Sequence, residues 1–384
     1  MNDESIDRMV GLRMIATAMI GAMMAACGDT SNLWDDAPEM RLVALPAIDA
    51  GAMPDGGGFG AIADIEIGDD GTVFVLDRMN RVVHVFDDEG TPITTIGRRG
   101  EGPGQFEQPV ALLWGPDDNL WVVDPGNGRY TVFDAAGSLV ATYPHSGGPV
   151  FMLFTIGFSE EGLLYIVTTG PDLVMGGYQL VEAELVDGQV VERRRIELPF
   201  VEGPTLFVRE GEGIDVVPVP FSPEPVLRIG PDGRLWYATT REPWVHRWSL
   251  SDGVEVTVGR ELDAPAVSPA EREEELGREY VEQLRSVAPS EFDEFASLIP
   301  ETKPPMRGFF LDDGGNVWIV RAGQSGAAGD ALTMDVYDSE GIPVATGRAA
   351  LTLDPTPRVR NDLLAGVVRD SLDVESIALY RIRR

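Results

Sequence analysis

A repeated unit of short alternating strands limits the fold of this 384-residue chain more than any other feature of its sequence. The first clear copy, in residues 60–96, has an apolar stretch, the turn Asp69-Asp70-Gly71, two further strands and a closing Asp87-x-x-Gly90 sequence. A second copy spans residues 109–143. Looser copies follow the sequences Glu160-Glu161-Gly162, Pro231-Asp232-Gly233, Asp312-Asp313-Gly314 and Asn361-Asp362. Period-two strands in units of about 45 residues predict a β-propeller with one four-stranded sheet per blade.

The first two copies share a more specific pattern. In the second copy, GEGPGQF (residues 100–106) and Pro109 precede LWVVD (residues 120–124), which is followed by Asn127, Arg129 and Val132-Phe133. The first copy repeats the pattern with residues 73–77, Asn80, Arg81 and Val85-Phe86. This pattern resembles the six-bladed propellers of the NHL-repeat class, and the resemblance covers about residues 40–384. It implies an all-β, six-bladed propeller and hardly anything about function.

Two segments depart from the repeat, and each has a predicted role. The apolar run MRLVALP (residues 40–46) precedes the first blade, and we expect it to supply the missing outer strand of blade six. Such a strand would close the ring without an exposed sheet edge. The sequence Ser268-Pro269-Ala270-Glu271 is a capping box, which predicts a short α-helical insertion over residues 268–299 between blades four and five.

The N-terminal residues predict export. Residues 14–26 (MIATAMIGAMMAA) are apolar, too few to span a bilayer of roughly 30 Å, and preceded by Arg8 and Arg13. They end before Cys27, the only cysteine of the chain. This layout resembles bacterial lipoprotein signals, which implies a cleaved signal peptide over residues 1–26 and a lipid on Cys27. We therefore expect a flexible tether over residues 27–39, a propeller over residues 40–384, and a location at the outer membrane or periplasmic face of the cell envelope.

Charge and histidine content exclude several classes of function. The chain has 63 Asp and Glu against 30 Lys and Arg, a formal net charge of −33 at pH 7, so we expect no nucleic-acid partner. It has only three histidines. We expect His84 and His246 on third strands away from the channel, and His145 in a solvated loop between blades. This placement argues against a histidine-based zinc site or catalytic triad.

Arginine and tryptophan residues form the candidate ligand site. Turns between second and third strands should share a face with the loops between blades, and arginines there stand out on an acidic protein. The candidate ligand-binding residues are Arg78, Arg98, Arg99, Arg241, Trp244 and Arg321. They predict a non-catalytic, monomeric binding module for a protein, a peptide or an envelope glycan, held at the membrane through Cys27.

Two alternatives stay open. Calcium-dependent hydrolases and lactonases of propeller shape use oxygen ligands that project into the central channel, and calcium requires about six of them. The polar inner-strand candidates here are Asp64 and Glu66, with Arg228 and Arg307 in later blades. We expect no catalytic metal and no other cofactor, and leave a structural calcium ion open. The second alternative is a structural component of an envelope complex.

Overall fold

The computed structural model describes residues 34, 38–49, 57–146, 155–169, 178–198, 205–210, 213–249, 253–278, 281–282, 285–286, 289–323 and 331–383. The chain divides into two units, residues 1–38 and 39–384, and every strand and helix named below belongs to the second. The predicted signal peptide, Cys27 and most of the predicted tether lie outside the described residues. Among those that are described, no helix has the length and apolar character needed to cross a membrane.

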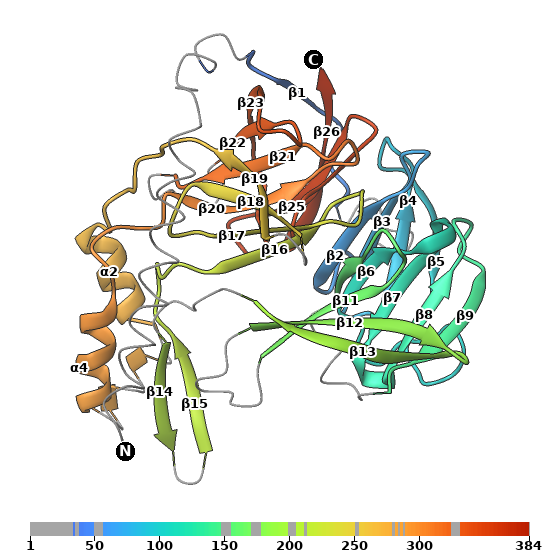
Figure 1. Cartoon of the computed structure of the whole chain (residues 1–384), viewed down its shortest axis with the longest axis horizontal. Helices are drawn as coiled ribbons and strands as arrows, with labels where there is room; N and C mark the ends of the chain where they lie inside the picture. Colours follow the sequence, from blue (N-terminus) through green and yellow to red (C-terminus); the bar gives the residue numbers. More distant parts are fainter. Residues whose placement is uncertain are drawn as a thin grey trace. The chain divides into compact units, whose positions relative to one another are not determined.

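The repeats form antiparallel sheets of four strands each, which are the blades (Figure 1). Blade one contains β2 (Ile62–Ile67), β3 (Val73–Asp77), β4 (Val82–Phe86) and β5 (Pro92–Ile96). Blade two contains β6 (Ala111–Trp114), β7 (Leu120–Asp124), β8 (Arg129–Phe133) and β9 (Leu139–Pro144), with short 3-10 helices at Pro116–Asp118 and Pro125–Asn127. Blade three contains β10 (Thr155–Phe158), β11 (Leu164–Thr169), β12 (Tyr178–Val186) and β13 (Gln189–Glu197).

The second half of the chain supplies three more blades. Blade four contains β16 (Pro225–Ile229), β17 (Leu235–Thr239), β18 (Trp244–Ser249) and β19 (Gly253–Gly259). Blade five contains β20 (Met306–Leu311), β21 (Val317–Arg321), β22 (Leu332–Tyr337) and β23 (Pro343–Ala349). Blade six contains β24 (Arg358–Arg360), β25 (Leu363–Arg369), β26 (Glu375–Arg383) and, from the start of the chain, β1 (Arg41–Ala44).

The first strands of the blades form a closed ring. Strand β2 contacts β6, and contacts continue from β6 to β10, β16, β20 and β24, which in turn contacts β2. The chain therefore folds as a six-bladed β-propeller, and the predicted fold class is confirmed.

Apolar side chains between neighbouring blades form the core. Between blades one and two, Phe74 and Leu76 lie in one cluster with Leu112, Leu120 and Phe133, and all five are nearly inaccessible to solvent. Trp121, Trp236 and Trp318 hold one register in the second strands of three blades, and each is buried. Burial of this kind is worth about 1.5–3 kcal/mol per large side chain, so the layers between blades supply most of the stability.

A buried aspartate anchors the chain segment that enters each of the first two blades. Asp77, at the end of β3, accepts hydrogen bonds from the backbone amides of Gly60 (2.7 Å) and Asn80 (2.9 Å). Asp124, at the same place in blade two, accepts one from the amide of Gln108 (2.8 Å). Both carboxylates are fully buried. Because buried amides need acceptors, this contact explains why the repeat places aspartate at the end of its second strand.

Strand β1 closes the ring as predicted. It pairs antiparallel with β26, in a register that places Leu42 opposite Ile382 and Ala44 opposite Tyr380. Met40 and Leu42 also pack into the apolar cluster between blades five and six. The first described strand thus completes the last blade, and β26 has no open edge along this pairing.

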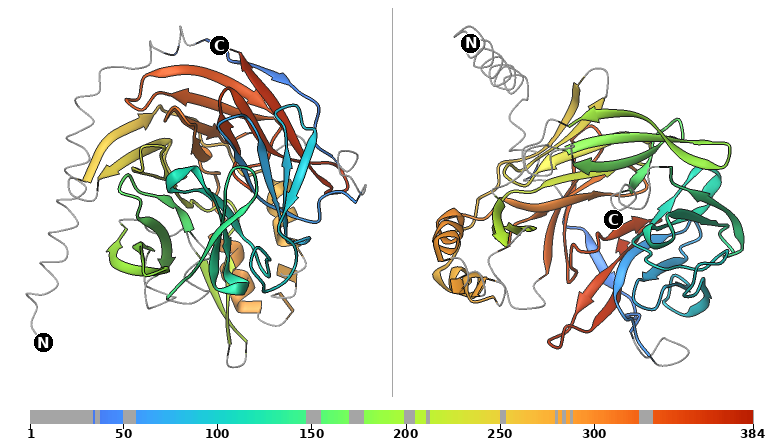
Figure 2. Two further views of the ribbon diagram at one scale, coloured as in Figure 1. Left: turned by 90° about the vertical axis from the view of Figure 1, so that its right-hand side faces the viewer. Right: turned by 90° about the horizontal axis from the view of Figure 1, so that it is seen from below.

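The helical insertion forms between β19 and β20, as predicted. It contains α2 (Pro269–Leu276) and α4 (Pro289–Leu298), and Ser268 and Glu271 exchange both hydrogen bonds of a capping box. Phe295 and Ile299 form a small core with Val219, which precedes blade four. A second insertion, the hairpin of β14 (Thr205–Glu210) and β15 (Gly213–Pro218), was not predicted; it contacts α4 and lies beside it in Figures 1 and 2.

Removal of β1 tests the closure. We expect a chain that begins at Leu45 to unfold several degrees lower than one that begins at Glu39, because it loses the β26 pairing and the packing of Met40 and Leu42. Thermal unfolding by circular dichroism measures the difference, and gel filtration measures the self-association expected of an open edge. Equal melting temperatures for the two chains would contradict closure by β1.

Candidate functional site

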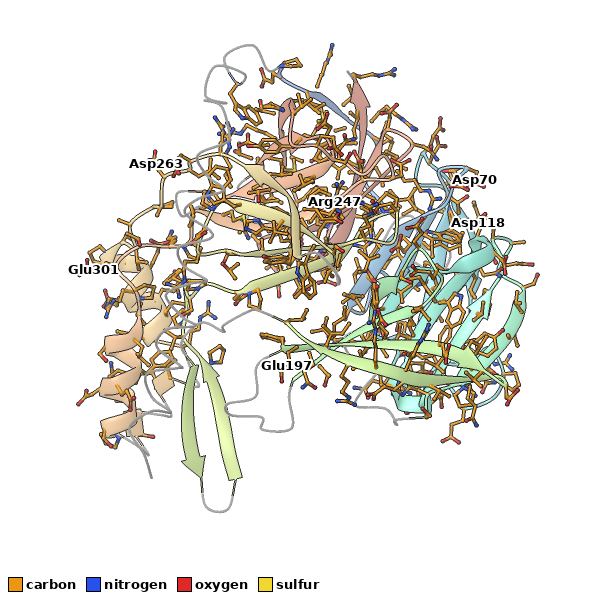
Figure 3. All side chains as sticks on the ribbon, viewed as in Figure 1. Asp70, Asp118, Glu197, Arg247, Asp263 and Glu301 are labelled. Carbon is orange, nitrogen blue, oxygen red and sulfur yellow. The ribbon has the colours of Figure 1, made fainter. Side chains whose placement is uncertain are left out.

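The antiparallel order of the strands gives the ring two ends of different composition. One end of the ring carries the turns between the first and second strands of the blades, and we call it the turn end. These turns include residues 68–72, 159–162, 230–233 and 312–315. Asp70 and Asp118, labelled in Figure 3, belong to it. The opposite end, which carries the second-to-third strand turns and the segments between blades, is the loop end.

A cavity of about 820 Å³ lies at the turn end of the channel. Its volume falls within the range of small-molecule sites. The charged residues that line it come from five blades: Glu66, Glu160, Glu161, Arg228, Asp232, Arg234, Asp312, Asp313, Arg358 and Arg360. Side chains of both signs therefore converge on one cavity that is open to solvent.

One arginine holds both acidic candidates of the first inner strand. The Arg358 Nε donates to Glu66 Oε1 at 2.9 Å, and its Nη2 donates to Asp64 Oδ1 at 3.1 Å. Asp64 also accepts hydrogen bonds from the backbone amides of Ile65 and Leu112, both at 2.9 Å. The Asp64 and Glu66 carboxylates are thus already satisfied by protein groups from three blades.

Burial shifts the ionisation of this network. It raises the pKa of Glu66 to about 7, against the opposing charge of Arg358, and it also raises the pKa of Asp64. Burial alone would lower the pKa of Arg358, but the carboxylates of Glu66 and Asp64 outweigh it and raise that pKa. The arginine consequently stays charged, while Glu66 takes up a proton near neutral pH.

A second channel arginine is bound differently. The Arg228 guanidinium, from β16, donates from Nη1 to the backbone oxygen of Leu227 (2.7 Å) and from Nη2 to Thr356 Oγ1 (2.8 Å). Its Nε is buried and has no hydrogen-bond partner. Burial, together with the nearby charge of Arg358, lowers the pKa of Arg228 to about 10, and the negative charge of Asp64 opposes this shift. This guanidinium is thus a charged donor facing the cavity with only neutral acceptors.

Protein groups bind acidic side chains in and beside the cavity lining. Arg358 stands between the two carboxylates that were the channel candidates for calcium, so its guanidinium takes the position of a cation. Within the described residues, no group of three or more His, Cys, Asp and Glu side chains is arranged to hold a metal. Ser159 Oγ accepts the amide of Leu163 and donates to Glu161, contacts that stabilise a turn and do not activate a nucleophile.

The predicted ligand residues lie at the loop end, away from this cavity. Arg78, Arg98, Arg99 and Arg241 are exposed there, and Trp244 is half-buried at the start of β18. Arg78, Arg98 and Arg99 belong to blade one and the segment that follows it, whereas Arg241 and Trp244 belong to blade four. Arg321 is held by the buried carboxylate of Asp335, which Arg260 also contacts. It occupies the strand position of Asp77 and has a structural partner within its own blade.

Sequence reasoning missed the two arginines of blade six. Arg358 and Arg360 alternate along β24, as Asp64 and Glu66 alternate along β2, so each pair points to one side of its strand. Arg360 pairs with Asp69 and lies over the Trp114 ring at 5.7 Å. The sequence signal that could have revealed this cluster is the pair of acidic residues on one first strand and the pair of arginines on another, both with a spacing of two residues.

The expectation for His145 was wrong. Its ring is buried, with a centroid 6.1 Å from that of Tyr130, and burial lowers its pKa. The reason is a backbone bridge between His145 and Val190, which draws the segment against blade three. His84 and His246 lie half-buried on third strands, as predicted.

Among the comparisons with known proteins, a family model agrees with the fold. A family model named DUF5128, described as a 6-bladed beta-propeller, matches residues 55–170. Curated proteins give no match to the sequence. Similar solved structures include a DUF4221 family member from Bacteroides vulgatus (9% identity, 91% of this chain and 100% of that one, TM-score 0.49). Another is a catalytically inactive variant of virginiamycin B lyase from Staphylococcus aureus (12% identity, 89% of this chain and 99% of that one, TM-score 0.45). A third is a gluconolactonase from Xanthomonas campestris (12% identity, 91% of this chain and 99% of that one, TM-score 0.41).

Replacement of Arg358 tests the channel network. We expect Arg358→Gln to lower the free energy of unfolding by about 3–5 kcal/mol at pH 8, because it leaves two buried carboxylates without their cation. The loss should shrink at pH 5, where Glu66 and Asp64, whose pKa values burial raises, take up protons. Chemical denaturation at both pH values measures this. Arg193→Gln, at an exposed position on β13, is the control, and a pH-independent loss would argue against the network.

Proposed function

We propose that this chain is an exported, lipid-anchored propeller of the NHL-repeat class that binds a partner and catalyses no reaction. The main support for this proposal is that Arg358 binds the carboxylates of Asp64 and Glu66 in the channel. Without Arg358, these carboxylates would be available to bind calcium or transfer protons. A rigid ring with satisfied polar groups and two loop-bearing ends is suited to recognition.

The partner surface is proposed at the loop end. Arg78, Arg98, Arg99 and Arg241 are exposed there on a chain whose net charge is −33. Arginine forks bind carboxylate and phosphate groups in two-point contacts, which favours acidic groups of a protein, a peptide or an envelope glycan as the contact. We leave Arg321 out of this surface because Asp335 binds it.

The helical insertion is proposed as a second docking element. Its core with Val219 holds α2 and α4 in place, and Glu273 and Glu274 are exposed on α2. The insertion therefore offers a partner acidic side chains in addition to the arginines. Attachment through Cys27 to the periplasmic face or outer membrane would present both elements to other envelope components.

A pull-down from envelope extract tests the partner surface. The baits are the chain from Cys27 onward, its Arg98→Glu/Arg99→Glu variant, and the control Arg193→Glu on the outer strand β13 of blade three. We expect retention of a specific partner to fall at least tenfold with the double variant, because two exposed cations become anions, and to be unchanged with the control.

A fourth bait, Glu273→Lys/Glu274→Lys, separates the two docking elements. Both glutamates are exposed, so the change should preserve the fold while it reverses the charge of α2. Loss of the partner with this bait would assign contact to the insertion. Equal retention of every protein by all four baits would overturn the proposed surface.

A further inference from the structure

We propose that the turn-end cavity contains an anion-binding site at Arg228, which takes the carboxylate group of a small ligand. This site is separate from the proposed partner surface, since it lies at the opposite end of the channel. The inference rests on how Arg228 is bonded, how much space faces it, and which charges surround that space.

The first step is that, among the described residues, no acidic side chain forms a hydrogen bond with Arg228, although Asp64 acts on it through its charge. The chain has more than twice as many acidic as basic residues, and the neighbouring arginines use them: Arg358 binds Asp64 and Glu66, and Arg360 binds Asp69. Across the residues that the structure describes, Arg228 forms hydrogen bonds only with the neutral oxygens of Leu227 and Thr356. A half-buried guanidinium with no hydrogen-bonded anion has only the longer-range charge of Asp64 to offset its partial desolvation, and a bound anion would offset more of it.

The second step is the unused donor. The Arg228 Nε is shielded from solvent and lacks an acceptor, although buried donors are nearly always bonded. The side chain lines the cavity, so an acceptor can approach the guanidinium from there, and a small shift of the guanidinium would bring Nε within its reach. A planar carboxylate matches the planar fork of arginine and can engage two nitrogens at once.

The third step favours a carboxylate over a phosphate. The cavity that Arg228 faces is also lined by Glu160, Asp232 and Asp313, whose negative charges oppose a doubly charged group more strongly than a single one. A monoanion with a neutral or positively charged remainder suits this arrangement: the carboxylate reaches Arg228, and the remainder lies among the acids. The volume of about 820 Å³ admits a ligand of small-molecule size.

Calorimetric titration with matched probes tests the site. The probes are N-acetylglycine, its neutral amide and inorganic phosphate, each at constant ionic strength. We expect N-acetylglycine to bind the wild-type chain at least tenfold more tightly than either other probe. Arg228→Gln should weaken N-acetylglycine binding at least tenfold and leave the amide unchanged, whereas the control Arg193→Gln should bind like wild type.

Thermal unfolding without ligand separates a binding role from a structural one. Arg228→Gln should melt at or above the wild-type temperature, because it removes a partly desolvated charge that has no hydrogen-bonded anion. A lower melting temperature together with unchanged N-acetylglycine affinity would overturn the proposal. So would failure of the wild-type chain to bind the acid, and tighter binding of phosphate would overturn the choice of carboxylate. The charge-reversed partner baits alter the loop end and α2, and the titration variant alters the cavity. Failure of the pull-down therefore does not contradict the anion site, and failure of the titration does not contradict the partner surface.

Discussion

The pairing of β1 with β26 is the contact on which the rest of the molecule depends, since it joins the two ends of the chain into one blade. Without β1, the outer strand of blade six would be β26, and its edge would be open. The neighbouring interface between blades six and one carries a dense set of polar contacts. Glu375 accepts the amide of Ile62, Arg381 binds Asp88, and Arg358 binds Asp64 and Glu66. The channel network is therefore also part of the closure, and the shape of the cavity follows from it.

The parts of the structure that local patterns encode could be predicted from the sequence. Period-two strands with Asp-Gly turns define the blades, an apolar run defines β1, and the capping box at Ser268 defines the start of α2. The cavity could not be found this way, because Arg358 and Glu66 are 292 positions apart and belong to the most degenerate and the clearest repeats. The burial of His145 depends on a bridge to the next blade, which no local pattern encodes.

Arg321 illustrates a limit of reading a repeat position by position. In blades one and two the end of the second strand carries Asp77 and Asp124, which bind backbone amides. In blade five an arginine stands there, and the balancing acid, Asp335, is on the next strand. The charge is reversed, yet the position still serves to hold the blade together. An arginine that departs from a repeat is thus evidence for a ligand only after its internal partners are known.

That criterion separates the arginines of the two ends. At the loop end the arginines are exposed and already solvated by water, so the proposed partner would gain little from any single one of them. In the channel the half-buried Arg228 guanidinium forms hydrogen bonds only with neutral oxygens, so a single carboxylate placed against it would have a larger effect. The same residue type therefore suits a broad surface at one end and a small, selective site at the other, and the difference comes from burial and not from sequence.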